Sequence, residues 1–203
     1  DDVEILIFDD DTLGRPALLH GTIHPVYVLV IAMRTGKSPS AVASRLEDLA
    51  PYAKLDLQFR ACDFEGIQLS GGDRSLLSLD MDGASPWQQG PLLPVRVLQA
   101  AAVVRRPISW TRARIQYLAG FTGSDTAAID EYVPEPHDTL LISKGLDGED
   151  PWISCAMPEH VTKAAEKLGW SEEQVCTRLE ALGVSIVTDE DLAEIRAVFS
   201  PGD

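Results

Sequence analysis

Apolar residues between positions 25 and 49 recur with the spacing of two amphipathic helices. Val28 and Ala32 are four positions apart, and Val42, Leu46 and Leu49 follow at successive helical spacings. Residues at such spacings lie on one helix face, so each segment has one stripe to bury. The pattern therefore predicts two helices that pack through these stripes.

The residues around the two stripes mark where each predicted helix begins and ends. Pro25 suits the first turn of a helix, where its missing N–H would be unpaired anyway. Gly36 can take the left-handed conformation that ends a helix. Ser38 followed by Pro39 is an N-cap followed by proline at the first helical position. The segment is thus predicted to form a helix-turn-helix.

The same arrangement returns twice along the chain, and such internal similarity decides the fold. The first copy matches a third copy 133 positions later without a gap, and a middle copy lies 69 positions after the first. The matched residues of the third copy are Pro158, Val161, Ala165, Gly169, Ser171, Val175, Arg178, Leu179 and Leu182, and those of the middle copy are Pro94, Val97, Ala101, Arg114, Ile115 and Leu118. In the middle copy Arg105 takes the place of the glycine and Pro107 takes the place of the serine. These replacements predict that the turn between the two helices has a different structure in this copy.

A second repeated element precedes the later copies. Asp82 to Trp87 matches Asp147 to Trp152, 65 positions on, with a shared Asp-Gly and Pro-Trp. Alternating or dense apolar runs at 55–59, 67–69 and 76–79 predict short strands, and a hairpin after the second helix would be the wing of a winged helix. The predicted fold class is α+β, with three tandem winged-helix-like modules at 1–80, 81–145 and 146–203. A further helix is predicted after Thr188, ending at Phe199.

The alanine, turn glycine and core aliphatics resemble those of the general helix-turn-helix family. They are Ala32, Gly36, Val42 and Leu46 in the first copy, and Ala165, Gly169, Val175 and Leu179 in the third. The tandem form, with its Asp-Gly and Pro-Trp lead, resembles winged-helix repeats of large actinobacterial proteins. Those repeats are associated with heat-shock-chaperone-type ATPases in conflict or defence systems. The resemblance implies an accessory array that works beside an ATPase or effector domain.

Composition narrows the range of partners. Seventeen basic residues stand against 32 acidic ones, a formal charge of -15, which disfavours phosphate backbones and anionic membranes. No apolar run is long enough to span a membrane, and the three cysteines have no metal-ligand spacing, which suits a cytoplasmic protein. Because the chain begins with Asp1 and has no initiator methionine, we expect it to be cut from a longer protein.

DNA binding is the obvious alternative for a helix-turn-helix array, since the second helix can read bases. The base-facing positions of the first copy would be Ser40, Ala43, Ser44 and Glu47, and those of the third would be Glu172, Glu173, Cys176, Thr177 and Glu180. Carboxylates there repel phosphates. The middle copy differs, because residues 83–124 contain five arginines and no acidic residue. The candidate binding surface is therefore Arg105, Arg106, Trp110 and Arg112.

Other repeated residues are predicted to be structural. Arg45, Arg114 and Arg178 recur beside a core aliphatic, so we expect each guanidinium to contact a carboxylate or carbonyl of its own module. Trp87 and Trp152 are expected to pack between modules. The chain contains no catalytic triad, phosphate-binding loop or zinc spacing, so no catalytic residue, metal or cofactor is predicted. The predicted function is a non-catalytic protein-interaction or scaffolding array, whose partner is another protein or another domain of the full-length chain. A DNA-binding regulator acting through the middle module is the alternative.

Overall fold

The computed structural model describes residues 7–10, 15–18, 20–83, 87–88 and 90–199 of the chain. Backbone proximity divides the chain into two compact units, which we describe separately. Unit 1 contains Asp1–Gly90 and Trp110–Asp125, and unit 2 contains Pro91–Ser109 and Thr126–Asp203.

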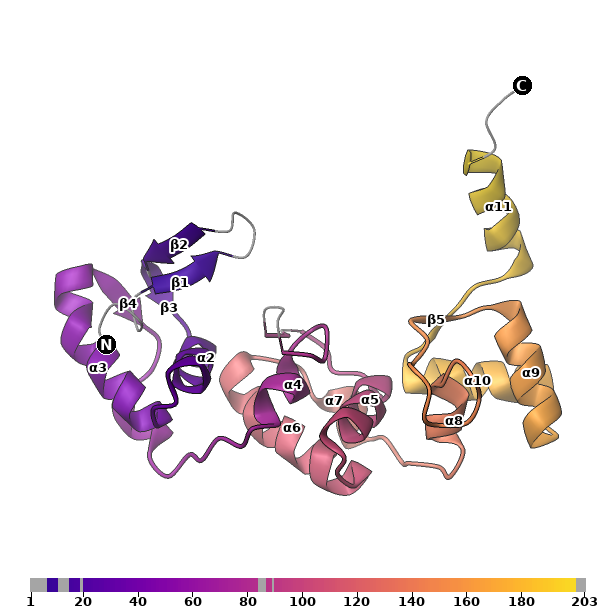
Figure 1. Cartoon of the computed structure of the whole chain (residues 1–203), viewed down its shortest axis with the longest axis horizontal. Coiled ribbons are helices and arrows are strands. Elements are labelled where there is room, and N and C mark those ends of the chain that lie inside the picture. The colour runs from indigo at the N-terminus through magenta and orange to yellow at the C-terminus, as the bar shows by residue number, and fades with distance from the viewer. Residues whose placement is uncertain (1–6, 11–14, 19, 84–86, 89, 200–203) are drawn as a thin grey trace. The chain divides into compact units, whose positions relative to one another are not determined.

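The secondary structure of the described residues is mostly helical, with short strands, as the α+β prediction requires (Figure 1). The helices are α2 (Pro25–Thr35), α3 (Pro39–Ala53), η1 (Ala61–Phe64), α4 (Asp73–Leu77), α5 (Pro94–Val104), α6 (Ile108–Thr122), α7 (Ala127–Asp130), α8 (Asp138–Ile142), α9 (Pro158–Leu168), α10 (Glu172–Leu182) and α11 (Asp189–Phe199). The strands are β1 (Ile7–Asp10), β2 (Arg15–Leu18), β3 (Gly21–Ile23), β4 (Leu55–Leu57), β5 (Cys155–Ala156) and β6 (Ser185–Ile186).

The three predicted helix pairs are confirmed at the predicted offsets. They are α2 with α3, α5 with α6, and α9 with α10, and each first helix begins at a proline. Ser38 and Ser171 cap the second helices of the outer pairs by accepting hydrogen bonds from the backbone N–H groups of Ala41 and Gln174. The middle pair is divided between the units, with all of α5 in unit 2 and most of α6 in unit 1.

The turn of the middle pair is built like the others, contrary to the sequence-based expectation. Gly36, Arg105 and Gly169 each end the first helix in the left-handed conformation, with φ of 66°, 53° and 67°. This conformation costs a residue with a Cβ atom roughly 1 kcal/mol, which the surrounding structure can offset. Replacement of glycine by arginine therefore preserved the turn.

The strands differ from the predicted wing. In the first and third copies, the strand after the second helix pairs in parallel with a strand that precedes the first helix: β4 with β3, and β6 with β5. A parallel pair cannot be closed by a tight turn, so β4 and β6 do not form the hairpin that was expected after the second helix. The antiparallel hairpin of the described residues, β1 with β2, instead precedes the first helix pair.

Two of the predicted strand segments also have other structures. Residues 67–69 are irregular, and 73–77 form the short helix α4. Asp73, Leu76 and Leu77 are all fully buried, which is the i, i+3, i+4 spacing of a helix. Helix α8 repeats this one-turn structure 65 positions later with Asp138, Leu141 and Ile142. Antiparallel bridges of Ser78 with Trp87 and of Ser143 with Trp152 follow the two short helices.

Each unit has its own buried core. In unit 2 the core contains Leu98 of α5, Leu141 of α8 and Leu179 of α10, with Trp152 and Trp170 packed at its edge. In unit 1, Phe64 of η1 stacks on Phe121 of α6 with ring centroids 5.7 Å apart.

The predicted last helix is confirmed as α11. Thr188 accepts a hydrogen bond from the Asp191 backbone N–H, and the Asp191 carboxylate accepts one from the Thr188 backbone in return. The hydrogen bonds that the backbone N–H and the hydroxyl of Thr188 donate to the Asp191 carboxylate lower the pKa of that carboxyl.

Candidate interaction site on helix α10

The second helices of the later two copies are each anchored by an arginine that binds a buried aspartate. In unit 1, Arg114 of α6 donates from Nε and Nη2 to the two carboxylate oxygens of Asp73, at 2.9 and 2.7 Å. Nη2 also donates to the backbone carbonyl of Gln68. The backbone N–H and hydroxyl of Ser70 complete the donors around the Asp73 carboxylate. The short helix α4 is thereby fixed against α6.

Unit 2 repeats this arrangement. Arg178 of α10 donates from Nε and Nη2 to the two carboxylate oxygens of Asp138, both at 2.8 Å, and to the carbonyl of Val133 at 2.9 Å. The Tyr132 hydroxyl and the Glu135 backbone N–H also donate to Asp138. Both aspartates are fully buried, so each carboxylate needs these donors to offset its desolvation.

The contacts with Asp138 shift the pKa values of two of the groups that donate to it. The hydrogen bond to Asp138 raises the pKa of the Arg178 guanidinium, against the lowering effect of burial. Burial and the hydrogen bond to Asp138 raise the pKa of the Tyr132 hydroxyl, which therefore remains a donor at neutral pH. The guanidinium is thus committed to groups of its own unit.

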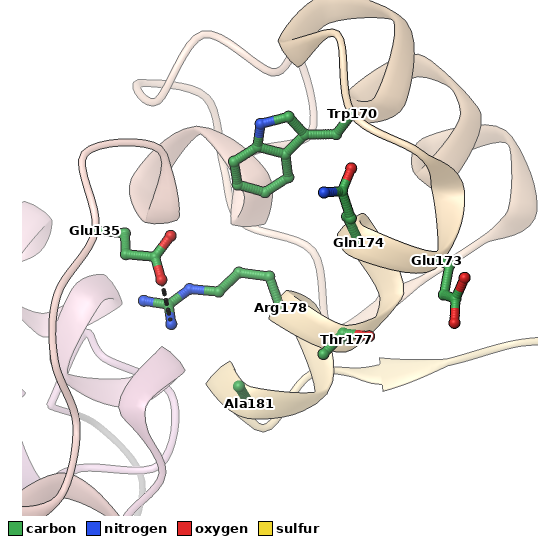
Figure 2. Close-up of a pocket in the computed structure, with 7 residues that line it drawn as sticks. All are labelled: Glu135, Trp170, Glu173, Gln174, Thr177, Arg178 and Ala181. Atoms are coloured by element: carbon green, nitrogen blue, oxygen red, sulfur yellow. Dashed lines mark ion pairs between the residues drawn. The ribbon is translucent and has the colours of Figure 1, made fainter.

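A pocket of about 500 Å³ lies beside Arg178 on the exposed face of α10 (Figure 2). The Trp170 indole lies across it from the ion pair of Arg178 and Glu135, whose Nη1 and Oε1 atoms are 2.9 Å apart. The remaining lining residues come from the first three turns of α10: Glu173, Gln174, Thr177 and Ala181. His137 contacts the Trp170 ring edge to face, with centroids 5.7 Å apart.

A second cavity of about 510 Å³ shares Arg178 and Ala181 with the first, so the two adjoin along α10. Its carboxylates are Glu131 and Glu180, and its apolar lining includes Leu93, Pro94, Tyr132 and Val133. We call the two cavities together the α10 groove. Four glutamates line this groove and Arg178 is the one basic residue among the lining residues described, so the groove is acidic.

The corresponding face of α6, in unit 1, has different chemistry. Trp110, Ala113 and Tyr117 occupy the positions that Gln174, Thr177 and Ala181 hold in α10, and both aromatic rings are exposed. Helix α6 contains no acidic residue. The equivalent positions of α3 hold Ala41, Ser44 and Asp48, all of them exposed. Ala43, expected at an exposed base-facing position of the first copy, is instead fully buried, so that expectation is wrong. The same helix face has therefore diverged among the three copies.

The structure does not gather the predicted binding surface in one unit. Arg105, at the end of α5, and Arg106 belong to unit 2 and are exposed, whereas Trp110 and Arg112 of α6 belong to unit 1. The role of these four residues stays a prediction.

The remaining repeated positions can also be located. Arg45 contacts Asp48 of its own helix at 3.5 Å, in an exposed pair. Trp87 and Trp152 form the equivalent bridges described above, and Trp152 packs on the core of unit 2. The repeat element of Trp87 includes residues 84–86, which lie outside the described residues. Sequence reasoning missed Asp73, Asp138 and Glu135, although the 65-residue offset relates the two aspartates.

Comparison with known protein families identifies the family to which the chain belongs. The family described as wHTH-Hsp90_Na associated matches residues 68–121 and 133–184, which together make up more than half of the chain. The chain belongs to this family of winged helix-turn-helix domains, which is a non-enzymatic kind of domain. No curated protein and no solved structure matches.

The family segments coincide with the arginine–aspartate pairs. Asp73 and Arg114 lie in the first segment and Asp138 and Arg178 in the second, whereas the predicted module boundaries at 80 and 145 separate the members of each pair. The boundaries themselves remain a prediction, but with them the expectation that Arg114 and Arg178 contact a carboxylate of their own module is wrong, because each aspartate lies in the preceding module. Among the described residues, no helix has the length and apolar character needed to cross a membrane.

Proposed function

We propose that this chain is a non-catalytic protein-interaction and scaffolding array that works beside an Hsp90-type ATPase within a larger cytosolic, defence-related protein. One observation carries the proposal: the exposed face of α10 is a groove lined by four glutamates, and its single arginine is held by Asp138. Such a surface repels nucleic acid and suits a protein partner. The family description, which pairs winged helix-turn-helix domains with Hsp90-type proteins, supports the choice of partner.

The ATPase association predicts direct binding. We expect the chain to bind the Hsp90-type ATPase domain encoded in the same or a neighbouring gene, with an affinity that isothermal titration calorimetry can measure. Because acidic groups line the binding face, the affinity should fall as salt is raised. An Hsp90 ATPase domain from an unrelated organism is the control. If the chain does not bind the cognate ATPase domain, the proposed association with an Hsp90-type ATPase is wrong.

DNA binding through the middle copy is the second candidate, and the acid-free helix α6 with Arg112 and Trp110 favours it. We expect no measurable binding to random duplex DNA at about 150 mM salt, where the Debye length is about 8 Å. Any weak binding at low salt should vanish when Arg105, Arg106 and Arg112 are replaced by glutamine, because few phosphate contacts would remain. A mobility-shift titration at both salt concentrations, with the original chain and the glutamine variant, measures this binding. Tight, salt-resistant binding would reverse the ranking of the two functions.

A further inference from the structure

The two adjoining cavities on α10 form a site whose chemistry specifies its occupant. The indole of Trp170 is half-buried at one end, and Leu93 and Val133 supply apolar surface in the second cavity, with exposed fractions of 38% and 73%. Two cavities in a row fit an extended chain with side chains in each of them better than a single compact molecule.

The charge of the groove selects a cationic occupant. Arg178 is paired with the fully buried Asp138, so its charge is already balanced before the groove glutamates are considered. Glu135 shares its Oε1 atom with Arg178 and is 45% exposed, which leaves Oε2 accessible to a second donor. Glu173, Glu131 and Glu180 are exposed on the same groove. The lining therefore has an excess of negative charge.

The aromatic wall adds a second reason for a cation. An ammonium or guanidinium group is attracted to the face of an aromatic ring, most strongly to that of tryptophan. Trp170 lies across the pocket from the carboxylate of Glu135 (Figure 2). A side chain that enters between them would contact an aromatic surface and a carboxylate together.

We propose that the α10 groove binds an extended basic segment of the partner protein, with one arginine or lysine in the Trp170 pocket and a second beside Glu131 and Glu180. This inference rests on the proposed function, and it deepens that function by naming the chemistry of the recognised segment. The apolar residue between the two cations would pack on Leu93 and Val133.

The test uses the chain alone and a defined peptide, acetyl-Gly-Arg-Leu-Arg-Gly-amide, with glutamate in place of both arginines as the anionic control. We expect NMR chemical-shift changes at the Trp170 indole N–H and the Thr177 amide with the arginine peptide, and none there with the glutamate peptide. Glu173→Gln should weaken binding roughly threefold, as should Trp170→Leu. Glu173 is exposed, so its variant tests the groove even if loss of Trp170 disturbs folding.

The matched control is Glu166→Gln, which removes the same charge from the exposed face of α9 outside the groove. It should leave the affinity unchanged. Equal weakening by Glu166→Gln and Glu173→Gln, or shifts spread over the whole acidic surface, would overturn the proposal and indicate nonspecific attraction. So would equal binding of the glutamate peptide. Binding of the ATPase domain is measured separately, so failure of the peptide experiment leaves the scaffolding function standing.

Discussion

Replacing Asp138 with alanine should lower the stability of unit 2 by about 3 kcal/mol, as expected when one partner of a buried ion pair is removed. Asp138 accepts hydrogen bonds from Arg178, from the Tyr132 hydroxyl and from the Glu135 backbone. The variant would remove this shared acceptor and leave Arg178, whose side chain is only 17% exposed, with only the Val133 carbonyl and Glu135 as partners. Native-state hydrogen exchange of the α10 amides would measure the loss within this unit.

Two further variants make that test specific. Lys163→Ala removes an exposed cation from α9 and should change the stability by less than about 0.5 kcal/mol. The double variant Asp138→Leu with Arg178→Met removes both charges, so it should be less harmful than Asp138→Ala alone. A loss below about 1 kcal/mol for Asp138→Ala would contradict an anchoring role and leave Arg178 available for a ligand.

The helix pairs could be predicted because their signals are local. Proline at the start, a left-handed residue at the end and a serine cap each act within one turn of the helix, and the spacing of aliphatic residues reports the buried face. The family match and the observed helices agree with that analysis. The turn at Arg105 was predicted less well, because its arginine was expected to change the turn. The free-energy cost of a side chain at positive φ is small compared with the free energy that helix packing contributes, so the turn is kept.

The strands could not be predicted in the same way. Pairs such as β5 with β6 contain two residues per strand, and which strand pairs with which depends on the packing of the helices between them. A dense apolar run such as Leu76 and Leu77 is also compatible with a strand or a helix until its buried aspartate is taken into account.

The candidate site depended on contacts that are remote in sequence. Arg178 was identified as a repeated structural position, but its partner Asp138 lies 40 residues away in the sequence. The groove also includes Leu93, the residue that precedes α5. Helical spacing predicted that Glu173 and Glu180 are exposed acidic positions, but it could not predict the cavities beside them. The step from an acidic helix face to a groove therefore needed the three-dimensional arrangement of unit 2.

The three-copy architecture makes a quantitative prediction about equivalent core positions. Leu46, Ile115 and Leu179 are related by the 69- and 133-residue offsets, and each is fully buried in a second helix. Truncation of each to alanine should cost about 3 kcal/mol, because it removes buried methyl groups and leaves a cavity that neighbours fill only in part. Hydrogen exchange of the α3, α6 and α10 amides would report each loss separately, and Glu180→Ala, an exposed change next to Leu179, should cost less than about 0.5 kcal/mol. If truncation of Ile115 were as mild as the surface control, the middle second helix would not be packed as its counterparts are, and the equivalence of the three copies would fail.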